Sequence, residues 1–230
     1  MPTAARKRSP LHRVARDMGA TFVDHDGWTI PDTYTGPDAE LTAARTGVVL
    51  LDESPNGKLL VEGDASEAVL SSAFQLPTID IGTSVWSNRV RAVRLRPDLF
   101  YLAVSPGEET KILSEIRSGA DGSFVTCTDI TQGRAEIRTI GPRSPELMSK
   151  VCGLDFSNDR FPDGQALQSS VAKTNQLIIR RDIGEWPAYS LIGARSLGAY
   201  LWSVLMEAGM EWDIQPIGRS AHRTLEESTS

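Results

Sequence analysis

Two aromatic residues with the potential to hold a planar ligand stand in a turn-rich stretch, residues 24–37, that shows no helical or strand period. A flat ring such as that of Trp28 or Tyr34 can cover a heterocycle by stacking. Long irregular segments of compact domains are often functional. The alternative is that both rings pack onto the domain that carries the loop, and the sequence leaves the two interpretations open.

Arginines gather on a strand predicted near residue 90. Side chains of a strand alternate between its faces, so Arg89 and Arg91 share one face while Arg94 and Arg96 share the other. Either pair could form a cationic patch that attracts a polyglutamate tail or an acidic partner. A solvated strand face is the other interpretation.

The sequence gives little support for a metal site, a reactive thiol or a general base. The segment Asp24–Asp26 holds two carboxylates and a histidine. On an extended segment, however, adjacent side chains point to opposite faces, and no second cluster is spaced to complete a coordination sphere. We therefore expect no metal site. His12 lies on an amphipathic segment without a partner to orient it. Cys127 and Cys152 lack CxxC or Cys/His ligand spacing, and reduced, buried thiols are expected.

The composition narrows the class of protein. The chain has 230 residues, 40% of them hydrophobic and 23% charged, which suits one large domain or two intimate ones. A net charge of −6 argues against nucleic acid as a partner. The sequence has no apolar run long enough to span a membrane and no secretory signal at its start, so we expect a cytoplasmic protein without membrane contact.

The middle of the chain predicts alternating elements. Strands are expected over residues 58–61, 90–95, 99–104 and 124–127, and helices over 65–74 and 108–116. Their order, β-α-β-β-α-β, is that of a ferredoxin-like unit. Asp64 is expected to cap the first of these helices.

The flanking regions predict further α+β structure. Before the middle unit we expect a helix over 9–20 with Ser9 as N-cap, a helix over 38–46 and a strand over 48–51. After it we expect strands over 134–140, 166–171, 176–180 and 188–191, and helices over 145–151, 196–208 and 219–227.

Residues 9–63 also carry motifs in a particular order. These are Ser9-Pro10-Leu11, then Gly27-Trp28 with Pro31, Tyr34 and Gly36, then Arg45, an apolar strand, and Asp52, Ser54 and Gly57-Lys58. This order resembles the start of the aminomethyltransferase family, the T-proteins of the glycine cleavage system, and of related folate-dependent demethylases. The resemblance continues at residues 60–65, 140–143, 200–209 and 216–221, and it extends to the gamma subunit of sarcosine oxidases.

The resemblance implies an α+β fold in which three domains surround a tunnel that holds tetrahydrofolate. The first domain would be discontinuous, over residues 1–56 and 132–230, and the ferredoxin-like second domain would occupy 57–131. The sequence stops where the family continues into a C-terminal β-barrel domain, so we expect this domain to be lacking and a second protein chain to complete the site.

Site residues follow from the resemblance, with departures from the family's pattern. The segment 82–95 holds no acid, and Asn88 and Arg89 stand nearest to the family's catalytic aspartate. The best counterpart of a glutamate that accepts a pair of pterin N–H groups is Glu185. His222 replaces an arginine that would hold the folate tail, with Arg223 one position later. Catalytic residues are therefore unknown, and the folate-binding set is Trp28, Tyr34, Asn88, Arg89, Glu185, His222 and Arg223.

Two functions remain open at this point. The first is a folate-dependent one-carbon transferase, or a subunit of one, which would demethylate a small one-carbon donor together with a partner chain. This chain would position the folate beside a reactive group that the partner chain forms. The second is a non-catalytic folate-binding or assembly module that has lost the catalytic aspartate. A fold alone does not choose between them.

Overall fold

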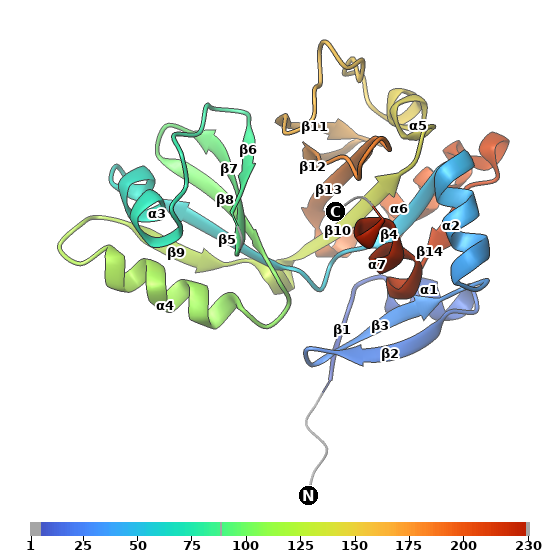
Figure 1. Ribbon diagram of the computed structural model, residues 1–230, viewed down its shortest axis with the longest axis horizontal. Helices are drawn as coiled ribbons and strands as arrows, with labels where there is room; N and C mark the ends of the chain where they lie inside the picture. Colours follow the sequence, from blue (N-terminus) through green and yellow to red (C-terminus); the bar gives the residue numbers. More distant parts are fainter. Residues whose placement is uncertain (1–5, 88, 229–230) are drawn as a thin grey trace, which may run out of the picture. The chain divides into compact units, whose positions relative to one another are not determined.

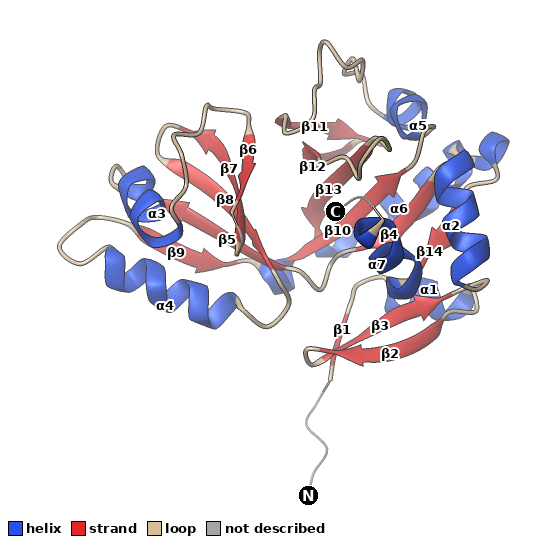
Figure 2. Ribbon diagram, in the orientation of Figure 1, coloured by secondary structure: helices blue, strands red, loops and turns tan. Residues whose placement is uncertain are grey.

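The computed structural model describes residues 6–87 and 89–228. The chain divides into two compact units (Figure 1). Unit 1 comprises Met1–Pro55, Ala135–Asp163 and Gln168–Ser230, and unit 2 comprises Asn56–Arg134 and Gly164–Leu167. Helices and strands alternate in both units (Figure 2), which gives a mixed α and β architecture.

Unit 1 is built on a six-stranded sheet with the order β11-β12-β13-β10-β4-β14. The strands are β4 (Val49–Asp52), β10 (Arg134–Ile140), β11 (Ala166–Val171), β12 (Thr174–Arg180), β13 (Ala188–Ala194) and β14 (Gln215–Ile217). β4 pairs antiparallel with β10 and parallel with β14. The central strands are buried on both faces, which predicts cover on both sides of the sheet.

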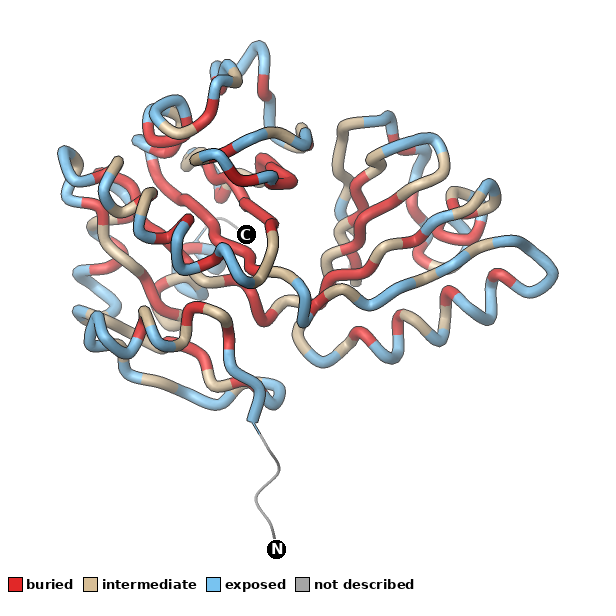
Figure 3. Tube along the Cα trace, turned by 180° about the vertical axis from the view of Figure 1, so that it is seen from behind, coloured by how far each residue is buried: buried red, intermediate tan, exposed pale blue. Residues whose placement is uncertain are grey.

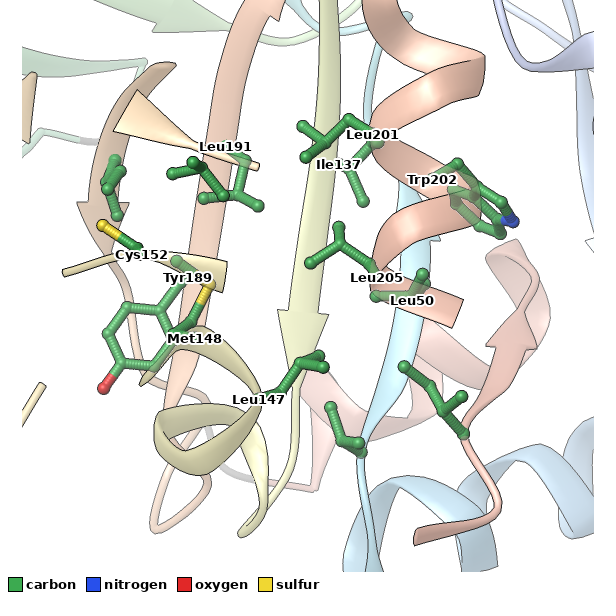
Figure 4. Close-up of a cluster of buried hydrophobic side chains, with 14 of the residues drawn as sticks. Leu50, Ile137, Leu147, Met148, Cys152, Tyr189, Leu191, Leu201, Trp202 and Leu205 are labelled. Atoms are coloured by element: carbon green, nitrogen blue, oxygen red, sulfur yellow. The ribbon is translucent and has the colours of Figure 1, made fainter. Parts of the chain in front are cut away.

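Helices supply that cover. α5 (Ser144–Val151) and α6 (Gly198–Ala208) bury their apolar residues with Leu50 and Ile137 in one cluster, which Figure 4 shows with Leu201, Trp202 and Leu205 of α6. α2 (Pro37–Thr46) and α7 (Arg219–Glu227) pack with Val49 in a second cluster. Because Val49 and Leu50 point to opposite faces of β4, unit 1 has helices on both faces of its sheet.

The N-terminal part of unit 1 forms a small three-stranded sheet with the order β1-β3-β2. It consists of β1 (Lys7–Arg8), β2 (Thr21–His25) and β3 (Trp28–Thr33), and the short helix α1 (His12–Asp17) lies between β1 and β2. The expectation of an irregular stretch is wrong over β3. The signal was Asp26-Gly27, where both residues have positive φ, as the two-residue turn of a hairpin requires.

Unit 2 contains a five-stranded antiparallel sheet with the order β6-β7-β8-β5-β9. Its elements are β5 (Gly57–Glu62), α3 (Ser66–Phe74), β6 (Ser84–Trp86), β7 (Val90–Arg96), β8 (Leu99–Val104), α4 (Glu109–Gly119) and β9 (Thr126–Asp129). The apolar residues of α3 and α4 share one cluster with the sheet. Asp64 makes no cap, since the N-cap of α3 is Ala65 and no side chain bonds there, so that expectation is wrong.

Buried residues run along the strands and the inner faces of the helices in each unit (Figure 3). Among the described residues, no helix is long and apolar enough to cross a membrane. Within the same ranges, no group of three or more histidine, cysteine or acidic side chains is arranged to hold a metal ion.

A buried carboxylate connects three segments of unit 1. Glu40 of α2 has no exposed surface. Its Oε1 accepts the backbone N–H of Tyr34 at 2.5 Å and of Thr35 at 3.1 Å, and its Oε2 accepts the N–H of Gly218 at 2.8 Å. Gly218 is required there, since a Cβ would lie 2.1 Å from the Asp32 carbonyl oxygen. Glu40 therefore holds the end of β3 and the start of α7 together.

We predict that Glu40→Gln lowers the free energy of unfolding by about 2 kcal/mol, because the new amide N–H₂ would face a backbone N–H and leave it without an acceptor. Urea denaturation measures the change. Asp38→Asn, in the exposed first turn of the same helix, is the matched control and should alter stability by less than about 0.5 kcal/mol. Equal losses for the two variants would contradict the role given to Glu40.

Candidate functional site

Five charged or titratable side chains converge within unit 1, and we call them the Glu53 cluster. Its members are Glu53, Arg138, Arg181, His222 and Glu226. Glu53 follows β4, Arg138 lies on β10, Arg181 follows β12, and the other two lie one turn apart on α7. Four segments distant in sequence thus bring their polar groups to one place. Buried charges need such partners, because removing them from water is costly.

Glu53 is the acid at the centre. Its Oε1 and Oε2 lie 2.7 and 2.6 Å from Nη2 of Arg181. Nη1 of Arg138 is 3.5 Å from Oε1, and the hydroxyl of Ser190 on β13 is 3.5 Å from Oε2. Of these contacts, the two with Arg181 are the shortest.

Arg138 is the more enclosed guanidinium, with 1% of its side chain exposed. Its Nη2 donates to the carbonyl oxygen of Arg181 at 2.6 Å, and its Nη1 lies 3.3 Å from Nε2 of His222. Nη1 is also 3.9 Å from Glu226 Oε1. Its Nε is buried and donates to no other described residue. Arg138 is thus anchored to neighbouring segments and retains one unused donor.

The electrostatics favour an ionised Glu53. Burial alone would raise the pKa of Glu53, but the charges of Arg181 and Arg138 lower it well below its ordinary value. Burial would likewise lower the pKa of Arg181, and the charge of Glu53 raises it above the ordinary value. Burial lowers the pKa of Arg138 to about 10, with the charge of Arg181 acting in the same direction. At neutral pH all three groups carry charge.

His222 is neutral at the same pH. Burial lowers its pKa to about 4, although Glu53 and Glu226 act in the opposite direction. Because an arginine only donates, Nε2 of His222 accepts from Arg138, and the proton of the neutral ring is then assigned to Nδ1. His222 therefore fixes the Arg138 guanidinium and adds no charge of its own.

The aromatic candidates lie in the small sheet region of unit 1. Trp28 on β3 has no exposed surface, and its ring packs with Nζ of Lys7 5.6 Å from the centroid, so neither face is open in this conformation. Tyr34 is partly buried, and burial raises the pKa of its phenol. Roles for both rings in ligand binding stay predictions.

The candidates near residue 89 belong to unit 2. Asn88 lies outside the described residues. Arg89 donates from Nη1 and Nη2 to the two carboxylate oxygens of Glu115 on α4, both at 2.8 Å. On β7, Arg94 pairs with Glu67 at 3.0 Å and Arg96 with Glu62 at 2.6 Å. Ion pairs with neighbouring elements thus take up part of the charge on this predicted cationic strand.

The remaining candidates return to unit 1. Glu185 is exposed, in the turn between Ile183 and Trp186. Arg223 is 60% exposed, with its Nε 3.6 Å from Glu227. Of the six predicted residues that the structure describes, His222 alone belongs to the Glu53 cluster. Sequence reasoning missed Glu53, Arg138 and Arg181. The available signal was a charged residue within a predicted strand, such as Arg138 in the strand expected over 134–140.

A family model, the GCVT N-terminal domain, matches residues 11–227. An aminomethyltransferase of Acidobacterium capsulatum is 27% identical over 96% of the chain and 62% of its own length. The chain thus spans less than two thirds of such relatives. An aminomethyltransferase T of the glycine cleavage system from Bartonella henselae, 21% identical, superposes with a TM-score of 0.84 over 96% of this chain and 62% of its own.

A further solved structure is of nearly the same length. A chain of the heterotetrameric sarcosine oxidase from Corynebacterium sp. U-96 is 19% identical, with a TM-score of 0.70 over 90% of this chain and 96% of its own. At this identity the likeness concerns the fold. The family model confirms the resemblance drawn from the motifs of residues 9–63, and both structures agree with it in fold.

We predict that acid destabilises the protein from pH 6.5 downward. With its pKa lowered from 6.5 to about 4, His222 takes up a proton more readily in the unfolded chain than in the folded one. Its contribution is present above pH 6.5 and lost by about pH 4, and amounts to roughly 3 kcal/mol. Glu53, also lowered, adds a further loss at still lower pH.

Chemical denaturation between pH 4 and 8 measures this profile. His222→Gln removes the titrating ring and should flatten the part between pH 4 and 6.5. His25→Gln, in the small sheet, is the control and should keep the slope of the unmodified chain. A slope unchanged in His222→Gln would contradict the assignment.

Proposed function

Because the chain belongs to the family of GCVT N-terminal domains, we propose that it binds tetrahydrofolate and serves in folate-dependent one-carbon transfer together with a partner chain. The observation that carries the proposal is the Glu53 cluster. It places an ionised carboxylate and two guanidiniums beside His222, the position that resemblance assigns to the folate tail. Homologous aminomethyltransferases support an enzyme or a subunit of one.

The residues of unit 1 suit the polar parts of a folate. Such a molecule offers N–H donors and acceptors at its pterin end and carboxylates at its tail. The buried Nε of Arg138 is an unused donor within the described chain, and Arg223 offers an exposed guanidinium on the same helix as His222. Glu185 is an exposed acid for the pterin edge, while Tyr34, Trp28 and Arg89 remain further proposed contacts.

The two units are proposed to be the two domains that the family pattern implies. Residues 1–56 and 132–230 would form the discontinuous first domain and residues 57–131 the ferredoxin-like second domain. In support of this, the elements of unit 2 follow a β-α-β-β-α-β order with the additional strand β6, and β5 lies between β8 and β9 in the sheet.

Bound tetrahydrofolate would supply the nitrogens that accept a one-carbon unit from a small donor, as in a demethylation. The chain's own part is to orient the folate and to keep its polar edges paired. The partner chain is proposed from the structural likeness to sarcosine oxidase. That protein is a heterotetramer, and the present chain aligns with 96% of one of its chains. A cytoplasmic location accords with a folate-dependent function.

A second function is favoured by one observation. The segment 82–95 has no aspartate or glutamate, so the chain has no acid at the position where the resemblance expects catalysis. A folate-binding or assembly module without catalysis of its own would require none. A transferase and a folate-binding module would both include the folate site, whereas a pure assembly module would not require it.

Calorimetric titration with tetrahydrofolate tests the proposal. We expect saturable binding at one site per chain. Arg223→Ala should raise the dissociation constant about tenfold, because a guanidinium–carboxylate pair contributes about 1.5 kcal/mol. Arg143→Ala removes an exposed arginine elsewhere in unit 1 and should change the constant less than twofold. Absence of binding by the unmodified chain would refute the folate proposal.

A further inference from the structure

Strand β9 lies at an edge of the five-stranded sheet of unit 2 (Figure 1). It pairs with β5, and no other strand of the described chain pairs with its outer side. The free backbone groups of an edge strand can bind a further strand, and lysine, proline or a bulge often prevents this. β9 has none of the three, and Thr126, Thr128 and Asp129 are exposed. β9 is therefore open to the addition of a strand.

The ladder with β5 determines which backbone groups of β9 point outward. Ile130, at the end of the strand, donates its N–H to the carbonyl oxygen of Lys58 directly opposite. Bonded residues alternate along an antiparallel strand, so Thr128 also bonds toward β5. The N–H and C=O groups of Cys127 and Asp129 then point to the open side, and they have no backbone partner among the residues that the structure describes.

The sequence around Cys127 is nearly symmetric, since a threonine stands on each side of it. In an antiparallel pair of two copies centred on Cys127, Thr126 of each copy lies opposite Thr128 of the other. Cys127 then lies opposite its own counterpart, and the outward N–H and C=O groups of the two residues bond to each other. Threonine pairs across antiparallel strands are stabilising. The edge is thus complementary to a second copy of itself.

The side of α4 next to β9 meets its own counterpart in the same pair. Leu113 of α4 and Cys127 pack against one apolar cluster. Burial raises the pKa of the Cys127 thiol to about 11, and the charge of Arg117 acts in the opposite direction, so Arg117 also lies on this side. We call this surface the α4 flank. It is concave, with a volume of about 700 Å³, and is lined by Thr110, Leu113, Ser114, Arg117, Ser118 and Asp121.

The α4 flank carries one charge of each sign. Arg117 and Asp121 are exposed and stand four positions apart, and neither makes an ion pair within the described part of the chain. A two-fold axis through the paired β9 strands runs the second α4 antiparallel to the first. Arg117 of each copy therefore approaches Asp121 of the other, and opposite charges placed in this way favour the association of two like surfaces.

We propose that two copies of this chain associate through β9 and the α4 flank, with the two β9 strands antiparallel about Cys127. The same surface serves both copies, as a two-fold axis requires. The two sheets form one continuous sheet with the α4 helices side by side. Phe124, 87% exposed and directly before β9, extends the contact, because the same register places it opposite Ile130 of the second copy. This assembly is independent of folate binding.

The size of the contact sets the expected affinity. A strand of 4 residues and one flank of a helix of 11 residues bury less than the area of about 800 Å² per partner that is typical of stable complexes. Sedimentation velocity of the full chain should therefore show a reversible dimer with a dissociation constant of about 10–100 μM.

Paired substitutions test the register of the two strands. Thr126→Lys with Thr128→Lys sets lysines against lysines across the axis and should raise the dissociation constant about tenfold or more. Thr126→Lys with Thr128→Glu sets each lysine against a glutamate at the same two positions and should leave the constant within about threefold. Both variants change the same exposed side chains, and thermal melting verifies that each is folded.

A charge exchange tests the α4 flank. Arg117→Asp sets acids against acids and should weaken the dimer about threefold, whereas Arg117→Asp with Asp121→Arg should restore the original constant. Thr42→Lys with Thr46→Lys, on α2 of unit 1, is the matched control for added lysines and should leave the dimer unchanged.

Three results would each overturn the proposal. The first is an unmodified chain that stays monomeric up to about 200 μM. The second is a dimer undiminished in the double-lysine variant, which would mean association through another surface. The third is a folded lysine–glutamate variant that no longer associates. If the double-lysine variant does not fold, the lysine–glutamate variant and the charge exchange on α4 decide.

Discussion

The ionised carboxylate of Glu53 is the constraint on which the centre of unit 1 depends. A buried negative charge is tolerated only beside opposite charge and hydrogen-bond donors. Arg181 and Arg138 meet this requirement from two further segments of the chain, and a neutral His222 then fixes Arg138. The ends of β4, β10 and β12 and one face of α7 must therefore keep their relative positions for the cluster to remain paired.

The rest of the unit holds α7 in its place. Leu225 and Ala221 of this helix pack in the apolar cluster with Val49 of β4. Glu40 accepts the N–H of Gly218 immediately before the helix begins. Apolar packing and this polar contact together set the direction of α7, which carries His222 and Glu226 to Glu53. A folate-binding function would thus depend on residues that never touch the ligand.

Elements with a continuous apolar run or a regular apolar spacing could be predicted from the sequence, as β8 and α7 demonstrate, because such patterns indicate which residues are buried. β3 was missed because its residues follow a turn signal, Asp26-Gly27, without alternation. The Glu53 cluster could not be predicted. Its members come from segments up to 173 positions apart, from Glu53 to Glu226, and only tertiary packing brings them together. Motif resemblance pointed to His222 but carried no information on Arg138 or Arg181.

The central claim is that unit 1 binds tetrahydrofolate beside the Glu53 cluster. A crystal structure of the chain with bound tetrahydrofolate is the decisive measurement. We expect a folate carboxylate within hydrogen-bonding distance of the exposed Arg223 guanidinium, with Arg138 still in contact with His222. A folate bound away from α7 would contradict this claim.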